Sequence, residues 1–170
     1  LHRAGMRGDH EIVKYIMSLL SGSQRLQIVS MKDNDGYTML HCVVDSYNDD
    51  RSVKFECVKA ILALCSESEL FSIVCMTDDH KQTVLHRTDA LYDHRIVKYI
   101  LSLLSESQRL QIVSMKDFDG DTMLHHAAKQ QSYDHQLIEE VLILLPESER
   151  VHLVSMQNHV GKTALHYAAD

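Results

Sequence analysis

Histidine and cysteine are the first residues to consider for chemistry, because both bind metals and both serve in catalysis. The chain of 170 residues holds 12 histidines and 4 cysteines. Four of the histidines close the same four-residue pattern, Thr-x-Leu-His, and could act as metal ligands or as bases: His41, His86, His125 and His166. Each recurs about one repeat after the last, so one structural role shared by all four explains them better than a metal or a reaction does.

The four cysteines do not form a convincing metal set either. None belongs to a C-x-x-C pair, and Cys57 and Cys65 are 8 positions apart (65 − 57), two helical turns, which is too far for one tetrahedral ion. Cys42 and Cys75 also stand in apolar sequence. Free cysteine is a common core residue in reducing compartments, so we expect buried thiols and a cytoplasmic location. A disulfide is the alternative.

Signatures of catalysis are missing from the sequence. It contains no G-x-S-x-G, no Gly-rich phosphate loop and no H-E-x-x-H. We therefore expect no catalytic residue, no metal ligand and no cofactor, and we expect that the chain is not an enzyme. A cryptic enzyme or metal protein is the competing interpretation, which metal analysis of the purified protein would test.

Composition and charge narrow the classes of partner. The chain is 45% hydrophobic and 24% charged, as in ordinary globular proteins. Its net charge is −7 and no run of Lys or Arg occurs, which argues against nucleic acid as the main ligand. No apolar stretch approaches the roughly 18 residues that would cross a bilayer, so we expect no membrane insertion. Because the sequence starts and stops inside a repeat, we expect it to be a piece of a longer protein.

The Thr-x-Leu-His tetrad recurs at regular intervals and sets the organisation of the chain. Its leucines lie 45, 39 and 41 positions apart (85 − 40, 124 − 85 and 165 − 124), a period typical of a repeat array. Leu1 and His2 look like the end of a further copy. We expect repeats at 38–82, 83–121 and 122–162 between partial repeats at 1–37 and 163–170. The tetrad residues with the expected structural role are Thr38, Leu40, His41, Thr83, Leu85, His86, Thr122, Leu124, His125, Thr163, Leu165 and His166.

Three helices are predicted for each repeat. The first begins after the tetrad Thr, whose hydroxyl or backbone the His reaches from the first turn. The second is typified by residues after Asp9, a candidate N-cap. Its apolar residues at helical spacing predict one buried stripe: Ile12, Tyr15, Ile16, Leu19 and Leu20. The third is short and begins at a capping box such as Ser21/Gln24; in the last copy Pro146 replaces the capping serine, and because Pro is tolerated at the first turn the helix can still form.

A polar loop closes each repeat, at 32–37, 78–82, 117–121 and 157–162, and we call these loops fingers. Three contain a Gly that suits a turn with positive φ, whereas the second has Lys81, which predicts a strained or differently shaped finger. Residues 83–99 form the least regular stretch, where Asp89 at an inward position would be costly unless hydrogen-bonded. Segment 9–36 returns as 93–120 with only four differences, so the two share surface residues through copying.

The pattern resembles the ankyrin repeat family over essentially the whole chain. The family's T-P-L-H-x-A-A stretch, glycine turn and following L-E-I-V stretch are matched by Leu1-His2-Arg3-Ala4, Gly8 and Glu11-Ile12-Val13. The extra short helix departs from the usual shorter repeat. The resemblance implies an all-α helical solenoid with short hairpin-like fingers. It also implies protein–protein interaction: a scaffold or adaptor segment without catalysis. A regulatory ankyrin domain of a larger channel, kinase or other multidomain protein is the alternative, and self-association through exposed terminal repeats is a further one.

Variation among the fingers marks the expected contact surface, with a neutral, drifting loop as the competing interpretation. Phe118 at a finger tip is the expected anchor, because aromatic residues carry much of the binding energy in interfaces. Four methionines, Met31, Met76, Met115 and Met156, are expected to pack between repeats rather than to line a groove. By alignment with the family, the expected contact residues are Asn34, Asp35, Tyr37, Asp45, Ser46, His80, Lys81, Gln82, Phe118, Asp119, Asp121, Lys129, Gln130, His159 and Lys162.

Overall fold

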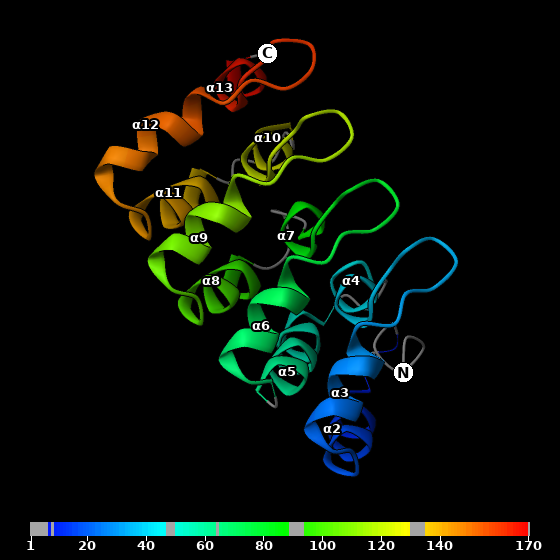
Figure 1. The fold of residues 1–170 in the computed structure, drawn as a ribbon. Coiled ribbons are helices and arrows are strands. Elements are labelled where there is room, and N and C mark those ends of the chain that lie inside the picture. Colours follow the sequence, from blue (N-terminus) through cyan, green and yellow to red (C-terminus); the bar gives the residue numbers. More distant parts are fainter. Residues whose placement is uncertain are drawn as a thin grey trace. The chain divides into compact units, whose positions relative to one another are not determined.

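The described part of the chain consists of helices joined by loops. The computed structural model describes residues 7, 9–46, 50–63, 65–88, 94–129 and 135–169, and it has no strand among them (Figure 1). The predicted all-α class is confirmed. None of the helices in these ranges has the length and apolar character that crossing a membrane requires.

The chain divides into two compact units, unit 1 (Leu1–Asp79) and unit 2 (His80–Asp170). Unit 1 contains five described helices: α2 (His10–Ser18), α3 (Gly22–Val29), α4 (Met39–Val44), α5 (Arg51–Leu62) and α6 (Glu67–Val74). Unit 2 contains seven: α7 (Val84–Arg87), α8 (His94–Ser102), α9 (Glu106–Val113), α10 (Met123–Lys129), α11 (His135–Ile143), α12 (Glu147–Ser155) and α13 (Ala164–Ala169). In order they repeat the predicted first, second and third helix followed by a finger.

The third helix of each repeat is present where the capping boxes predict it. The backbone amides of Ser21, Ser66 and Ser105 donate to the side chains of the residues three positions on, at 3.0, 2.8 and 3.0 Å. These bonds satisfy amides that the first turn leaves unpaired. In the last copy Pro146 takes the place of the capping serine as the N-cap of α12, and the helix forms as predicted.

Arginines of the third helices close the second helices that precede them. The Nε atoms of Arg25, Arg109 and Arg150 donate to the carbonyl oxygens of Met17, Leu101 and Leu142, each at 2.8 Å. A cation at the C-terminal end of a helix meets free carbonyls and the negative end of the helix dipole. Arg25 and Arg109 are among the residues that the two copied segments share, and here they have a structural role that the sequence analysis did not assign.

The predicted apolar stripe of α2 is wrong by one position. Val13 and Met17 are fully buried, whereas Ile12, Tyr15 and Leu19 are 50%, 66% and 66% exposed. Apolar residues occur on both sides of this short helix, so their spacing alone could not select the buried side. Asp9 occupies the predicted N-cap, but its side chain makes no capping hydrogen bond. In α5 that role falls to Asp50, whose carboxylate accepts from the amides of Ser52 and Val53.

The first helices start at the tetrads and differ in length. Helix α10 has 7 residues, while α7 has 4 and ends at Arg87, with Thr88 as its C-cap, as the irregular sequence there predicts. Asp89 lies outside the described residues. Helix α10 packs against α7 on one side and α13 on the other, and Leu124 is 1% exposed. Helix α13 packs against α10 and α12, and its Leu165 is 63% exposed.

The finger with Lys81 keeps the conformation of the others. Lys81 has φ 60°, and Gly36, Gly120 and Gly161 in the same slot have φ 77°, 78° and 77°. Of the two predicted alternatives, the strained finger is therefore correct, because the left-handed conformation costs a residue with a Cβ roughly 1–2 kcal/mol. Met31 is one of the four methionines that were expected to pack between repeats. It lies just beyond the end of α3 and is 57% exposed, so that expectation is wrong for this residue.

The two tetrad leucines provide a matched test of this packing. We expect Leu124→Ala to lower the free energy of unfolding by about 2–5 kcal/mol, the cost of truncating a fully buried leucine. Leu165→Ala removes the same atoms from an exposed side chain, and we expect it to cost about 0.5 kcal/mol or less. Urea denaturation followed by circular dichroism measures both values. Equal losses would contradict the packing described for α10.

The finger glycines provide a second matched pair. Gly120 and Gly161 have nearly the same φ, but a Cβ at Gly120 would lie 2.9 Å from the His159 backbone nitrogen, whereas a Cβ at Gly161 would meet nothing within 4 Å. We expect Gly161→Ala to cost about 1 kcal/mol for the left-handed conformation alone. Gly120→Ala should cost at least about 1 kcal/mol more, because the neighbouring finger must move. Thermal melts of both variants measure the difference, and equal costs would show that the fingers are not in close contact.

Candidate functional site

Two of the tetrad histidines, His86 and His125, make hydrogen bonds through both ring nitrogens. In unit 2 the Nδ1 atom of His125 accepts from the Thr122 amide at 3.1 Å and lies 2.9 Å from its hydroxyl. Its Nε2 atom lies 3.1 Å from the carbonyl oxygen of Lys162 in the next finger. Because a carbonyl only accepts, Nε2 carries the proton and the ring is neutral. The predicted bond to the tetrad Thr is present in all four copies.

This arrangement leaves these imidazoles little capacity for other chemistry. His86 repeats it, with Nδ1 3.1 Å from the Thr83 amide and Nε2 3.1 Å from the Met115 carbonyl. A metal needs a free lone pair, and the lone pair of Nδ1 is already engaged. Burial, helped by the neighbouring His126, lowers the pKa of His86 to about 4, and burial also lowers the pKa of His125. The two rings are therefore uncharged at neutral pH.

The cysteine thiols are also poorly suited to chemistry. Burial raises the pKa of Cys57, Cys65 and Cys75 to about 11. The nucleophile and metal ligand is the thiolate, which is scarce at neutral pH when the pKa is so high. All four cysteines lie among the described residues, and none of them forms a disulfide.

An Asp or Asn five positions before the tetrad Thr holds three of the fingers closed. Asp117 Oδ1 accepts from the amides of Asp119 and Asp121 at 3.0 and 2.9 Å. Asp33 and Asn158 make the same pair of bonds in their own fingers. Backbone bonds between Asp117 and Asp121 and between Gly120 and Asp117 complete the turn. The sequence analysis missed this role, although Asp or Asn in that slot of all four fingers was the available signal.

Consecutive fingers are joined by a backbone hydrogen bond in the same register. The amide of Phe118 donates to the His80 carbonyl at 3.1 Å, and the amide of His159 donates to the Asp119 carbonyl at 3.0 Å. In unit 1 the Asp79 amide and the Asp35 carbonyl are 3.4 Å apart in the same arrangement. In Figure 1 the fingers before α10 and α13 extend to the same side of unit 2. The finger backbones are thus fixed independently of their variable side chains.

A cluster of Asp117, Asp121 and His126 offers three ligand atoms within 4.8 Å of one another, the one such group among the described residues. Its lone pairs are already in use. Asp117 Oδ2 accepts from His126 Nε2 at 2.8 Å and from Gln82 Nε2 at 3.3 Å. Asp121 receives the Lys129 ammonium on one oxygen and the Asn158 amide, at 2.8 Å, on the other. The cluster is therefore a compensated buried network, in which an ammonium already supplies the positive charge.

The pKa directions agree with this assignment. Burial would raise the pKa of Asp117, but the hydrogen bonds from His126, the Asp121 amide and Gln82 hold it below its usual value. Burial would lower the pKa of Lys129, but its hydrogen bond to Asp121 and the charge of that carboxylate raise it. Both groups are thus stabilised in their charged forms.

The expected contact residues fall into several groups. Nine are exposed: Asn34, Asp35, Asp45, His80, Lys81, Phe118, Asp119, Lys129 and His159. Tyr37, Gln82 and Lys162 are half-buried, and Gln130 lies outside the described residues. Ser46 and Asp121 are 5% and 1% exposed, so expecting them on an accessible face was wrong. Asp121 turns inward because Lys129 and Asn158 satisfy its carboxylate, while Ser46 follows the end of α4 and is covered there.

Phe118 is the most prominent aromatic side chain on a finger. It is 53% exposed, and the Lys81 ammonium lies 4.9 Å from its ring centroid. Tyr37, in contrast, stacks on His41 with ring centroids 6.1 Å apart. Val160, which is 76% exposed at the tip of the finger 157–162, was not predicted. An apolar residue directly before the finger glycine was the sequence signal for it.

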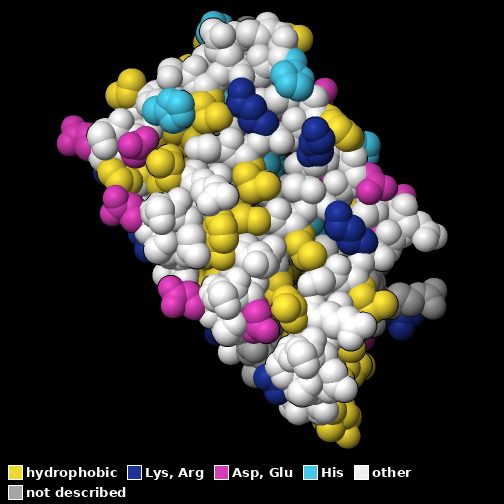
Figure 2. Space-filling view, in the orientation of Figure 1, with side chains coloured by type: hydrophobic (Ala, Val, Ile, Leu, Met, Phe, Trp, Pro, Cys, Tyr) yellow, Lys and Arg dark blue, Asp and Glu magenta, His cyan; other side chains and the backbone are white. Residues whose placement is uncertain are grey.

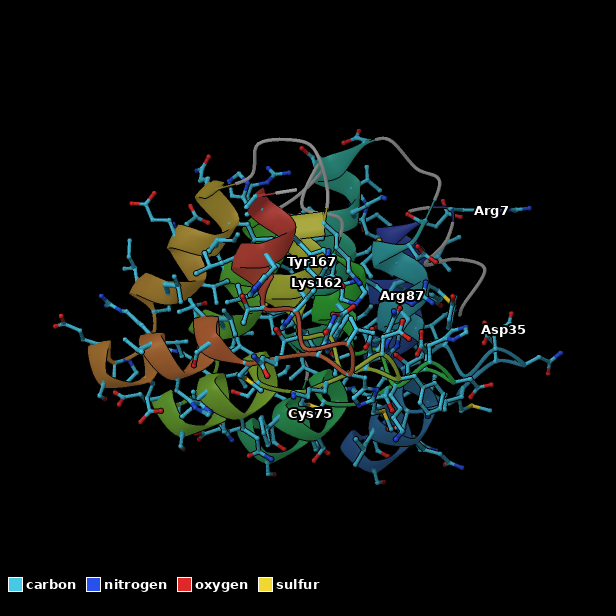
Figure 3. All side chains as sticks on the ribbon, turned by 90° about the horizontal axis from the view of Figure 1, so that it is seen from above. Arg7, Asp35, Cys75, Arg87, Lys162 and Tyr167 are labelled. Carbon is cyan, nitrogen blue, oxygen red and sulfur yellow. The ribbon has the colours of Figure 1, made fainter. Side chains whose placement is uncertain are left out.

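Lys162 and Lys129 share an aromatic neighbour at the last finger. Their ammonium nitrogens lie 4.9 and 4.7 Å from the Tyr167 ring centroid, and Figure 3 shows Lys162 and Tyr167 close together. The Tyr167 hydroxyl accepts from Asn158 Nδ2 at 2.9 Å. Tyr167 thus connects Lys129 of α10 with Asn158 and Lys162 of the last finger.

Comparison with known proteins adds no family to this description: no family model matches the chain, and no curated protein matches it.

The neutral tetrad histidines predict a loss of stability in acid. Because the pKa of His86 is about 4 when folded and near 6.5 when unfolded, the unfolded chain binds more protons between these values. Stability is therefore complete above about pH 6.5 and falls as the pH drops towards 4. For His86 alone we expect a loss of about 2 kcal/mol between pH 7 and pH 5.

His86→Gln isolates this contribution, because Gln keeps an acceptor for the Thr83 amide and does not titrate. We expect the variant to lose about 2 kcal/mol less than the parent chain over that pH interval. Urea titrations at pH 7, 6 and 5 measure it, with the exposed His152→Gln as control. Identical pH profiles for His86→Gln and the parent would contradict the neutral, buried imidazole.

Proposed function

We propose that this chain is an ankyrin-type repeat array that binds a partner protein through its fingers and first helices. The repeated order of three helices and a finger, with a Thr-x-Leu-His tetrad at each first helix, supports the type of array. The observation that carries the function is Phe118, 53% exposed on a finger whose backbone is fixed on both sides.

A fixed loop with an exposed aromatic side chain suits recognition. The Phe118 amide is bonded to the finger before it, and the Asp119 carbonyl is bonded to the finger after it. Little backbone entropy remains to be lost when a partner binds, so more of the interaction energy appears as affinity. An aromatic ring that fills a pocket on a partner is a typical anchor of such interfaces.

The polar residues that would support catalysis serve the framework instead. His125 bridges the start of its helix and the next finger, and three thiols have a pKa of about 11. This supports a scaffold or adaptor segment without catalysis of its own. Four cysteines without a disulfide also support a reducing, cytoplasmic setting.

Phe118→Ala tests the proposal. We expect the variant to melt within a few degrees of the parent, because it loses only a surface cation–π contact of about 0.5–1 kcal/mol. Its affinity for the partner should fall at least about tenfold, the effect of removing a hot-spot aromatic. The partner is identified by crosslinking to the parent chain, and the affinities are then measured by calorimetry with purified components.

Tyr15→Ala is the matched control, since Tyr15 is an aromatic residue 66% exposed on α2 rather than on a finger. We expect it to leave the affinity unchanged. If Phe118→Ala binds as tightly as the parent, or if Tyr15→Ala weakens binding equally, the finger is not the anchor and the proposal is wrong. Tyr37 is unsuitable for this test because it stacks on His41.

A further inference from the structure

The fingers of unit 2 carry a concentration of positive charge in a chain that is negative overall. Three lysines stand on these loops or directly before them: Lys81, Lys116 and Lys162. The described residues of the same three fingers include two exposed carboxylates, Asp79 and Asp119, whereas Asp117 and Asp121 are buried and engaged by His126 and Lys129. The chain as a whole has a net charge of −7, so this surface differs in sign from the average.

These lysines belong to one connected surface. Lys81 lies over the Phe118 ring at 4.9 Å, which links the first two fingers of unit 2. The Lys116 ammonium donates to the Gln157 carbonyl at 2.7 Å, which links the second and third. The backbone bonds from Phe118 and His159 run parallel to these contacts. We call this set the basic finger surface: Lys81, Lys116, Phe118, Val160 and Lys162.

The opposite charge gathers elsewhere in unit 2. The third helices begin with acidic residues, Glu106 in α9 and Glu147 and Glu149 in α12. Figure 2 shows Asp and Glu side chains at the edge over α9 and α12 and others on the side of the fingers, with Lys and Arg side chains on the face between them. Arg109 and Arg150, which also lie on these helices, direct Nε to backbone carbonyls. The lysines Lys81, Lys116 and Lys162 thus lie at the fingers, while the acidic residues named here lie at the starts of the third helices.

We propose that the basic finger surface binds an extended acidic segment of a partner protein, one that also carries an apolar residue for Phe118 or Val160. The inference rests on the proposed function and names its chemistry. Lysines whose ammonium groups are partly in solvent attract carboxylates and steer their approach. A net charge of −7 repels acidic chains elsewhere, so the surface also selects where such a segment binds.

Geometry sets the length of the segment. Lys81 and Lys162 precede α7 and α13, which are two first-helix steps apart, with α10 packed against both. Packed helices lie about 8–10 Å apart, so the two lysines are separated by roughly 20 Å. An extended chain advances about 3.3 Å per residue and covers this distance in about six residues. Acidic residues every third position would meet successive lysines.

A synthetic peptide tests this directly on the purified chain. The probe is a rhodamine-labelled peptide of 12 residues with four Glu at every third position, two Leu, and Ser elsewhere; a second probe has Gln for every Glu. We expect fluorescence anisotropy at 50 mM NaCl to show at least about tenfold tighter binding of the Glu peptide. The preference should shrink at 300 mM NaCl, as screening requires.

Paired variants locate the binding. Lys81→Gln with Lys162→Gln should weaken binding of the Glu peptide at least about fivefold, on the scale of two exposed ion pairs. Lys81→Arg with Lys162→Arg should retain it, which guards against a loss caused by misfolding. Lys14→Gln with Lys98→Gln removes the same net charge from α2 and α8, and we expect less than a twofold change.

Several outcomes would overturn the proposal. These are equal binding of the Gln peptide, an equal loss in the Lys14/Lys98 control, and no binding at millimolar concentration. Sedimentation showing a dimer that Lys81→Gln with Lys162→Gln abolishes would assign the surface to a second copy of the chain and would also refute it. If the Glu peptide does not bind while Phe118→Ala still weakens partner binding, the proposed function stands and only the proposal of an acidic partner segment is refuted.

Discussion

The rest of the structure depends on the two hydrogen bonds that a neutral tetrad imidazole makes. In His125 one nitrogen accepts from the amide that starts its own helix, and the other donates to a carbonyl in the next finger. Both bonds are possible only for the uncharged ring with its proton on Nε2. Burial keeps the ring in that form. The start of one helix and the shape of the following loop are thereby fixed by a single side chain.

The fingers are fixed mainly through backbone atoms, which explains why their side chains can vary. Asp117 closes its own loop through backbone amides, and the ladder from Phe118 and His159 also uses backbone atoms. Neither depends on the side chains at the tips, which can therefore differ from finger to finger while the backbone stays the same. The exception is Asp121, whose carboxylate is drawn inward by Lys129 and Asn158.

The charged side chains of unit 2 fall into buried pairs and exposed lysines. The buried carboxylate of Asp117 is paired with His126, and that of Asp121 is paired with Lys129. The charges of Asp121 and Lys129 therefore compensate each other. Lys81 and Lys116 are left to make exposed contacts, with an aromatic ring and a backbone carbonyl. A chain with a net charge of −7 thus presents a local surface of the opposite sign. These two contacts join side chains and backbone of neighbouring fingers.

The sequence by itself determined the helical repeats, the capping boxes, the tetrad bond and the left-handed finger slot, because each depends on residues within a few positions of one another. Burial was decided by tertiary structure. Ile12 and Ile96 occupy the same place in two nearly identical segments, yet they are 50% and 2% exposed. The inward turn of Asp121 likewise depends on Asn158, 37 positions away. Local sequence fixes which hydrogen bonds a segment can make, whereas its neighbours in space decide which of its surfaces meet water.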